Sequence, residues 1–348
     1  MNSCNTQKAC DDVVCQNGGE CVDGDCECPD GFSGPNCEIG PYSNGVFIVH
    51  EGGFQAGNAS LSFYSEDYDV TSNGIFTAAN SIPLGDVAQS MTIIGDKGFI
   101  VVNNSGKIEV VNLEGLSSAG TITGLSSPRY IAVVSSSKAY VSDLFSGAIT
   151  IFNPQTLNTN GSIGVVGQVE EMVNTSSGVL AAGSGANQVY RINTTTDQLS
   201  DSVAVGIGPS QLAVDANGKV WVLTNGGWGT EAPKLVRINP SDMSIELSLE
   251  FTLSDFPSSL KTNAAGTSLY WANSGVFKMD ITATSIPTTA FIATAVYKVN
   301  ADPETDIIYV SDAGDFASNG KVYRYQSDGT LVDTFNVGVI PAEFTFTN

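Results

Sequence analysis

A unit of three short strands around two tight turns recurs along this chain of 348 residues. The clearest copy is IIGDKGFIVVNNSGKIEVVN, residues 93–112, in which turns at 96–98 and 103–106 carry the Gly, Asn and Asp residues that hairpins need. Aligned on the last residue of its second strand, the unit occurs seven times at intervals of 39 to 53 residues, ending at His50, Asn103, Asp143, Gly183, Thr224, Asn273 and Asp312.

One large apolar residue stands three positions before each of these ends: Phe47, Ile100, Tyr140, Leu180, Trp221, Tyr270 and Tyr309. A period near 40 residues built from hairpins is typical of a β-propeller, in which each repeat is a four-stranded blade that cannot bury its faces alone. No window of ten or more residues has helical apolar spacing. The sequence therefore predicts an all-β fold with seven four-stranded blades.

The two ends of the chain predict how the ring closes. The first repeat begins at Gly45 with what aligns as a second strand, and the segment AEFTFT, 342–347, aligns with the first strands of other repeats. We expect this segment to pair into the first blade, because the pairing satisfies two otherwise exposed sheet edges. The predicted organisation is a tether over 1–9, a small module over 10–38, a linker over 39–44 and the propeller over 45–348.

Cysteine is confined to the N-terminal segment, at Cys4, Cys10, Cys15, Cys21, Cys26, Cys28 and Cys37. A segment this short cannot bury enough apolar surface to hold itself, so the dense cysteines predict disulfides made in an oxidising compartment. A zinc site is the alternative that the spacing disfavours. Cys4 is the odd cysteine, and we predict that it carries the lipid of a bacterial lipoprotein; a free thiol is the alternative.

The charge of the chain excludes one class of partner. The chain has 14 Lys and Arg residues against 36 Asp and Glu residues, a formal net charge of −22. Such a surface repels phosphate backbones and anionic headgroups, so we expect no nucleic-acid partner and no membrane contact beyond the lipid anchor. The abundance of Ser, Thr, Asn and Gly is typical of secreted or surface proteins.

Three long loops predict the functional face. Loops from second to third strands gather on one face of a propeller with the loops between blades, and insertions there are informative. The segments 51–58, 225–233 and 313–320 are Gly-rich, and each carries one aromatic residue, Phe54, Trp228 or Phe316. We interpret these aromatics as ligand contacts. The alternative is that each folds back over its own blade.

The loops between blades add polar residues to the same face. Arg129 next to Tyr130 is a candidate polar anchor, with an ion pair to Asp86 or Glu170 as the alternative. Polar residues that end second strands either contact ligand or cap turns. The complete set of predicted ligand-binding residues is Phe54, Gln55, Gln89, Asn104, Arg129, Tyr130, Phe145, Glu171, Gln211, Asn225, Trp228, Trp271, Tyr297 and Phe316.

Catalytic patterns are missing from the sequence. His50 is the only histidine, its neighbours do not form a nucleophile elbow, and the propeller has no cysteine. We therefore expect a binding protein without cofactor and not an enzyme. A calcium-dependent hydrolase or lactonase is the alternative, because calcium needs only oxygen ligands.

The N-terminal module resembles an EGF-like domain. The segment CQNGGECVDGDCECPDGFSGPNC, 15–37, has the Asn-Gly-Gly turn, the Cys-x-Cys pair and the Gly-Phe-x-Gly turn of that family. The resemblance implies pairing of Cys10 with Cys21, Cys15 with Cys26 and Cys28 with Cys37. We expect the module to act as a spacer that lifts the propeller off a membrane.

The propeller resembles the BtuG-type proteins. The strings that carry the resemblance are NASLSFY (58–64), GDVAQSM (85–91), VVNNSGKI (101–108), SPRYI (127–131), KAYVSD (138–143), EAPKLVRI (231–238) and the run 322–344. The BtuG-type proteins are outer-membrane lipoproteins on the cell surface of Bacteroidetes. The resemblance implies a seven-bladed propeller that captures cobalamin and passes it to a TonB-dependent transporter of the BtuB type. A relative that binds haem or a siderophore, or an adhesion propeller, is the alternative.

Overall fold

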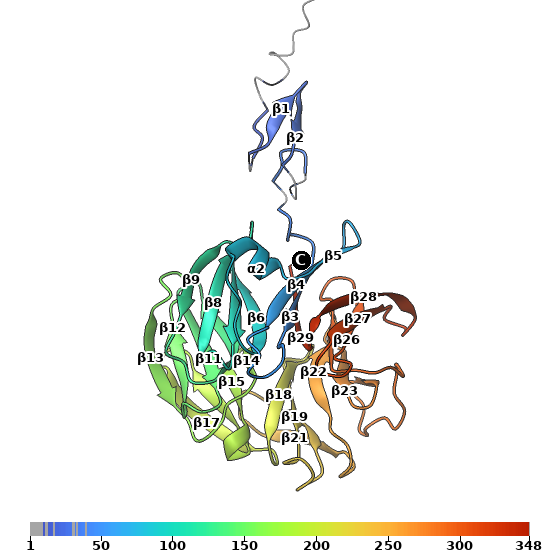
Figure 1. Cartoon of the computed structure of the whole chain (residues 1–348). Coiled ribbons are helices and arrows are strands. Elements are labelled where there is room, and N and C mark those ends of the chain that lie inside the picture. Colours follow the sequence, from blue (N-terminus) through green and yellow to red (C-terminus); the bar gives the residue numbers. More distant parts are fainter. Residues whose placement is uncertain are drawn as a thin grey trace, which may run out of the picture.

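A computed structural model describes residues 10, 13–16, 18–29, 32, 34–38 and 40–347. Seven sheets are arranged as blades around a common axis, and a small two-stranded module precedes them (Figure 1). The predicted all-β, seven-bladed propeller is confirmed. In Figure 1 the module stands beyond the side of the ring where the C-terminus lies.

The strands follow the predicted order. Blade 1 consists of β29 (Pro341–Phe346), β3 (Gly45–His50), β4 (Ser60–Ser65) and β5 (Val70–Ser72). Blade 2 consists of β6 (Ala88–Ile94), β7 (Lys97–Val102), β8 (Lys107–Asn112) and β9 (Ser118–Ile122). Blade 3 consists of β10 (Pro128–Ser135), β11 (Lys138–Asp143), β12 (Ala148–Phe152) and β13 (Thr159–Gly164). Blade 4 consists of β14 (Met172–Thr175), β15 (Gly178–Gly183), β16 (Gln188–Asn193) and β17 (Gln198–Ala204). Blade 5 consists of β18 (Pro209–Val214), β19 (Val220–Thr224), β20 (Lys234–Ile238) and β21 (Ile245–Glu250). Blade 6 consists of β22 (Ser258–Thr262), β23 (Ser268–Ala272) and β24 (Val276–Asp280). Blade 7 consists of β25 (Lys298–Ala301), β26 (Ile308–Asp312), β27 (Asn319–Tyr325) and β28 (Leu331–Val339).

The N-terminal module is held by covalent links. Its disulfides join Cys10 to Cys21, Cys15 to Cys26 and Cys28 to Cys37, so the pairing implied by the EGF-like resemblance is confirmed. Between them, β1 (Glu20–Val22) and β2 (Asp25–Glu27) form a hairpin. Cys4, the predicted lipidation site, lies outside the described residues.

The hydrophobic core consists of seven clusters, one between each pair of adjacent blades. A strand such as β7 supplies both sides, because side chains alternate along it: Ile100 and Val102 pack toward blade 1, and Phe99 and Val101 toward blade 3. Second strands buried on both faces explain the continuous apolar runs in the sequence.

The residues three positions before the second-strand ends are all buried, as predicted. Six of them pack against the following blade, whereas Ile100 packs against the preceding one. Phe99 packs between blades 2 and 3, as its counterparts do in their own blades, so the alignment on Asn103 is wrong by one residue and Phe99 is the true equivalent of these residues. A shift of one residue moves a side chain to the other face of a sheet.

The ring closes through the C-terminus, as predicted. The strand β29 pairs antiparallel with β3, from Pro341 opposite His50 to Phe346 opposite Val46. The rings of Phe344 and Phe346 pack on Tyr309 of blade 7, at 5.7 and 5.3 Å between centroids.

Blade 6 departs from the predicted pattern of four strands. Within the described chain its sheet has three strands, and only an isolated bridge between Val276 and Ile292 continues it outward. The segment 281–297 takes an irregular path in place of a fourth strand. Pro287 lies in this segment, and a proline has no N–H to donate to a sheet.

A short helix fills the longest interval between repeats. Helix α2 (Ile75–Asn80) follows Gly74, whose φ of 67° allows the chain to turn into it. Its Ile75 and Phe76 are buried between blades 1 and 2, and the Asn80 side chain hydrogen-bonds the backbone of residues 116 and 118. With six residues this helix is shorter than the ten-residue windows in which the sequence shows no helical spacing.

His50 is a structural residue at the closing seam. It is fully buried; its Nδ1 lies 3.2 Å from the Ser60 carbonyl oxygen, and its Nε2 accepts the N–H of Gly338 at 3.1 Å. Burial lowers the pKa of His50 to about 4, although the hydrogen bond to Ser60 opposes the shift. Both ring nitrogens are engaged, so His50 is not available as a metal ligand.

We predict that removing residues 342–348 will unfold the ring. Loss of a single buried Phe such as Phe344 costs about 3–5 kcal/mol, and the deletion also exposes the edge of β3. In thermal unfolding, the cooperative transition should be absent or its midpoint temperature should be strongly lowered. Removal of residues 1–38 is the control, and an equal loss of stability in that variant would contradict the prediction.

We predict that His50 makes the propeller less stable in acid. The unfolded chain takes up a proton near pH 6.5 and the folded chain only near pH 4, so stability present above 6.5 is lost as the pH falls between these values. At about 1.4 kcal/mol for each tenfold change in proton affinity, the loss is about 3 kcal/mol. Urea titrations at several pH values should give a flatter profile for His50→Gln; an unchanged profile would contradict this account.

Candidate ligand-binding face

We name the two faces of the ring by their distance from the N-terminal module. The chain enters the propeller at Gly45, and the first strand it makes runs to His50 on the opposite face. That distal face carries the second-to-third-strand loops, including 51–59, 225–233 and 313–318, together with the loops between blades. The proximal face carries the remaining turns, such as 66–69.

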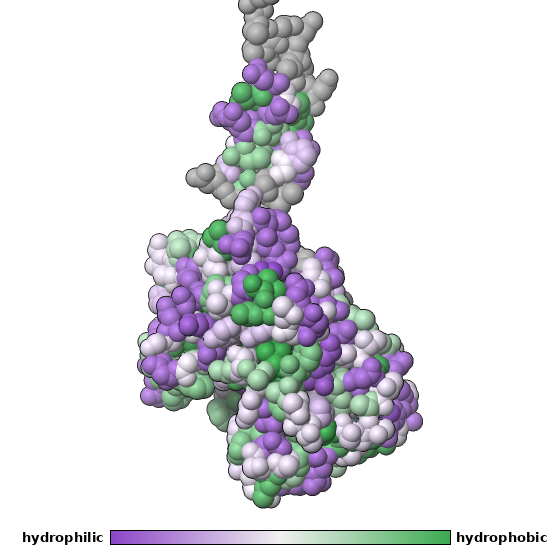
Figure 2. All heavy atoms as spheres, turned by 90° about the vertical axis from the view of Figure 1, so that its right-hand side faces the viewer, coloured by the Kyte–Doolittle hydropathy of each residue, from purple (hydrophilic) through white to green (hydrophobic). Residues whose placement is uncertain are grey.

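Exposed large apolar side chains gather on the distal face. Phe54 is 70% exposed, Trp228 74% and Phe316 54%, so the alternative that they fold back over their blades is wrong. Loops on this face also expose Phe145, Val166, Leu253 and Phe256. Elsewhere, on the side that faces right in Figure 1, hydrophobic residues form small separate patches in a hydrophilic surface (Figure 2).

The aromatic loops are held by tight turns. Trp228 and Phe316 both have a positive φ, 58° and 59°, which directs each side chain out of its turn. The loop of Trp228 is fixed by Asn225, whose Oδ1 accepts the N–H of Gly227, and the loop of Phe316 by Asp315, whose Oδ1 accepts two backbone N–H groups. Such loops lose little conformational entropy when a ligand binds.

Two pairs of aromatic rings form on this face. Trp228 stacks on Phe256 from the neighbouring loop, with centroids 6.2 Å apart and planes 22° apart. Phe316 meets Tyr297 edge to face at 5.6 Å. Each pair joins a second-to-third-strand loop to a segment between blades.

The central channel opens among these loops. Aligned by their pairing to the second strands, the inner strands place one residue per blade at the same level: Glu343, Ser90, Tyr130, Glu171, Gln211, Ser258 and Lys298. One residue nearer the distal face, Arg129 donates to Glu170 at 2.8 Å and also to Gln89. The predicted alternative for Arg129, an ion pair with Glu170, is therefore present.

Lys261 bridges the channel. Its Nζ lies 3.0 Å from Glu171 and 3.7 Å from Glu343. Burial alone would lower the pKa of Lys261, but the two carboxylates outweigh it and the pKa is raised. This lysine therefore stays charged and holds blades 4, 6 and 1 together across the axis.

Lys298 differs from the other cations of the channel. Within the described chain its ammonium has no hydrogen bond or ion pair and lies 4.9 Å from the centre of the Tyr297 ring. Burial lowers its pKa, and Glu51 and Glu343 only partly oppose this. The Tyr297 hydroxyl donates to Glu51 at 2.9 Å, and burial together with that carboxylate raises its pKa.

The channel itself is narrow. The cavity beside Lys261, Glu171 and Glu343 has a volume of about 140 Å³. Sites for drug-sized ligands usually measure about 300–1,000 Å³. This cavity therefore admits only a small group, and a larger ligand would lie outside it.

The predicted ligand-binding residues divide into three groups. Exposed or partly exposed on the distal loops are Phe54, Gln55, Asn104, Phe145, Asn225, Trp228 and Phe316. At the mouth or wall of the channel are Gln89, Arg129, Tyr130, Glu171, Gln211 and Tyr297. Trp271 is fully buried between blades 5 and 6, so its prediction as a ligand contact is wrong.

Several polar residues of this face hold turns. Asp143 accepts four backbone N–H groups from residues 126, 127, 145 and 146. Asp86 accepts from the backbone of Gln55 and from the side chain of Asn104, and so joins the loops of blades 1 and 2. Asp143 therefore caps turns, as the alternative stated. Asn104 has two roles, because it donates a hydrogen bond to Asp86 and is also exposed on the distal face.

Sequence reasoning missed Phe256, Lys261 and Lys298. Phe256 lies in a loop between blades that was not recognised as an insertion, although the interval of 49 residues from Thr224 to Asn273 signals extra chain there. The two lysines stand out only as cations in inner strands of an acidic protein.

Among the described residues, no group of three or more His, Cys, Asp or Glu side chains is arranged to hold a metal ion. The same residues include no helix long and apolar enough to cross a membrane.

The seven sheets define the chain as a seven-bladed β-propeller. The chain belongs to the family described as domain of unknown function DUF5074, whose model matches residues 44–347. A comparison with curated proteins gave no match.

Solved structures share the fold at low sequence identity. A quinonprotein alcohol dehydrogenase-like protein of Bacteroides thetaiotaomicron is 14% identical, with a TM-score of 0.66 over 88% of this chain and 79% of its own. A putative 6-phosphogluconolactonase of Bacteroides fragilis is 16% identical, with a TM-score of 0.62 over 88% and 98%. A protein of unknown function from Desulfotomaculum acetoxidans is 15% identical, with a TM-score of 0.64 over 87% and 99%. At this identity the likeness shows the fold alone.

We predict that Lys261→Met will destabilise the propeller by roughly 3–5 kcal/mol, because it leaves the buried Glu171 and the partly buried Glu343 without the cation that they share. Urea unfolding at pH 7 measures the effect. Adding Glu171→Gln to Lys261→Met should recover part of the loss, and Lys321→Met, at an exposed lysine, is the control. Equal stability of Lys261→Met and Lys321→Met would contradict the bridging role.

Proposed function

We propose that this protein is a non-enzymatic binding protein of the cell surface that captures a corrinoid of the cobalamin class on its distal face. The observation that carries the proposal is the group of exposed aromatic side chains on tightly held loops of that face, Phe54, Phe145, Trp228, Phe256 and Phe316. Exposed apolar groups of this kind mark interaction sites on soluble proteins.

The physical character of a corrinoid suits this surface. It has a broad, flat ring that stacks on aromatic side chains, and amide arms that need hydrogen-bond partners at its edge. The rings of Trp228, Phe256 and Phe316 supply stacking surface. Gln211, at the channel mouth, supplies an amide within reach of an arm. A cavity of about 140 Å³ excludes the whole ligand from the channel, so the ring would lie across its mouth.

The resemblance to the BtuG-type proteins supports the same ligand and adds a partner. In that scheme the protein is a lipoprotein anchored through Cys4, and it delivers ligand to a TonB-dependent transporter of the BtuB type. The chain enters the ring on the proximal face, which leaves the distal face free to meet a second protein. The disulfide-linked module serves as the spacer in this arrangement.

The test is calorimetric titration of the purified protein with cyanocobalamin. We expect one-to-one binding that Trp228→Ala and Phe256→Ala each weaken by about tenfold or more, equivalent to about 1.4 kcal/mol for one stacked ring. The matched control is Tyr68→Ala, because Tyr68 is an equally exposed aromatic on the proximal turn 66–69.

Two results would overturn the proposal in different ways. If cyanocobalamin gives no heat of binding, a corrinoid is excluded as the ligand. Haemin and a ferric siderophore would then be titrated against the same variants. Binding that Tyr68→Ala weakens as much as Trp228→Ala would remove the distal face as the site.

A further inference from the structure

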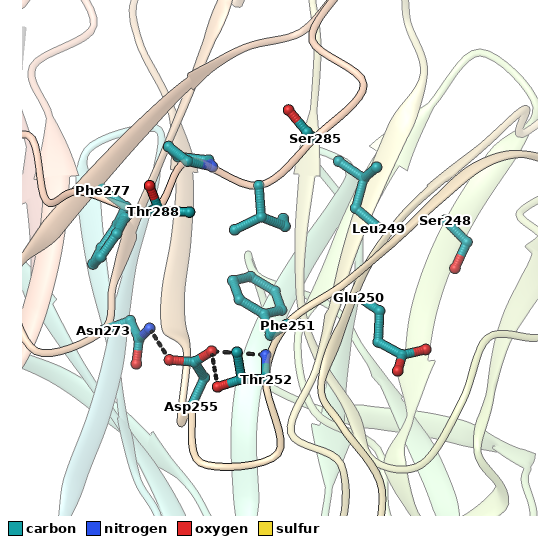
Figure 3. Close-up of a pocket in the computed structure, with 12 residues that line it drawn as sticks. Ser248, Leu249, Glu250, Phe251, Thr252, Asp255, Asn273, Phe277, Ser285 and Thr288 are labelled. Carbon is teal, nitrogen blue, oxygen red and sulfur yellow. Dashed lines mark hydrogen bonds between the residues drawn. The ribbon is translucent and has the colours of Figure 1, made fainter.

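A groove lies between blades 5 and 6, separate from the central channel (Figure 3). On one side it is bounded by the end of β21 and the chain that follows it, and on the other by β24 and by 285–288 of the irregular segment. Its volume is about 480 Å³, within the usual range for small-molecule sites. None of the residues predicted from the sequence to bind ligand lines it.

An aromatic wall forms the inner side of the groove. Phe251 and Phe277 line it, and both rings pack on the buried Trp271, Phe251 edge to face at 6.0 Å and Phe277 stacked at 5.8 Å. Leu249 and Ile286 extend this apolar surface. The wall is rigid, because Trp271 holds both rings from behind.

Polar side chains lie at the edge of that wall. Figure 3 shows a hydrogen-bonded set below the ring of Phe251, in which Asp255 accepts from Thr252 and from the amide of Asn273. The second amide hydrogen of Asn273 and the hydroxyls of Ser285 and Thr288 have no partner within the described chain. These groups remain available for hydrogen bonds to a ligand.

The charges of the groove limit the ligand further. Of its twelve lining residues none is Lys, Arg or His, and two are acidic, Glu250 and Asp255. An anion would meet no cation there, in a chain whose net charge is −22. Seven lining residues have polar side chains and five are apolar, so a purely apolar ligand would leave hydrogen-bonding groups unpaired.

We propose that this groove binds a neutral carbohydrate. A pyranose ring has an apolar face of C–H groups that packs on Phe251 and Phe277, and a rim of hydroxyls that both donate and accept. The hydroxyls of that rim can form hydrogen bonds with the side chains of Asn273, Ser285 and Thr288 and with the remaining acceptor capacity of Asp255. The proposal does not depend on the corrinoid, since the groove and the channel mouth are lined by different residues.

One loop borders both the groove and the distal face. Phe256 belongs to the same loop as Thr252 and Asp255, and its N–H donates to Asn273 at 3.2 Å. The stacked pair of Phe256 and Trp228 is exposed on the distal face and does not line the groove.

The experiment is saturation-transfer NMR of the full chain with maltose and with cellobiose, in the absence of corrinoid. We expect at least one disaccharide to bind saturably, with transfer to its C–H protons. Glucuronic acid should bind more weakly than glucose, because its carboxylate meets Glu250 and Asp255 without a cation. Thr288→Trp should fill the groove and weaken disaccharide binding by about tenfold or more, or about 1.4 kcal/mol.

The matched control is Thr289→Trp, an exposed neighbour that does not line the groove. Cyanocobalamin titration of both variants keeps the two proposals distinguishable, since neither residue lies at the channel mouth. The carbohydrate site is overturned if neither disaccharide binds saturably, if Thr288→Trp and Thr289→Trp weaken binding equally, or if glucuronic acid binds as tightly as glucose.

Discussion

Packing between neighbouring blades is the interaction on which this molecule depends. Each blade is a small sheet with two apolar faces, and seven clusters bury those faces only when all blades stand side by side. The seam between blades 7 and 1 is made by the two ends of the chain, through β29 and β3. Pairing of these two strands therefore completes the ring and buries the facing sides of blades 7 and 1.

The same packing explains where function can reside. Side chains of second strands are used for burial, so ligand contacts are left to the loops and to the inner strands. Closing the ring brings distant residues together: Lys261 meets Glu171, 90 positions away, and Tyr297 meets Glu51 across 246 positions. Blade 6 lacks a regular fourth strand, and the groove with the aromatic wall lies where its irregular segment faces β21.

Much of the fold and part of the candidate site could be predicted because the signals are local. Turn residues, alternating apolar runs and a constant period determine the blades, and cysteine spacing indicated the disulfide module. The loops of Phe54, Trp228 and Phe316 were found from their length and glycine content. The burial of Trp271 depends on the neighbouring blade that covers it, which no local pattern specifies. The facing of Ile100 toward the preceding blade was not predicted because its repeat was aligned one residue off, and the six-residue helix α2 is too short to give an apolar period.

The sequence by itself determined the number of blades, the closing strand and the position of the exposed aromatics, since period and turn chemistry are properties of neighbouring residues. Only the tertiary structure decided the charge pairs of the channel and the groove between blades 5 and 6. Those arise from residues of different blades, and a period does not specify which side chains meet across the ring. Lys298 illustrates the difference: its place in an inner strand is local information, whereas the distance of its ammonium from the carboxylates of the described chain depends on the other blades.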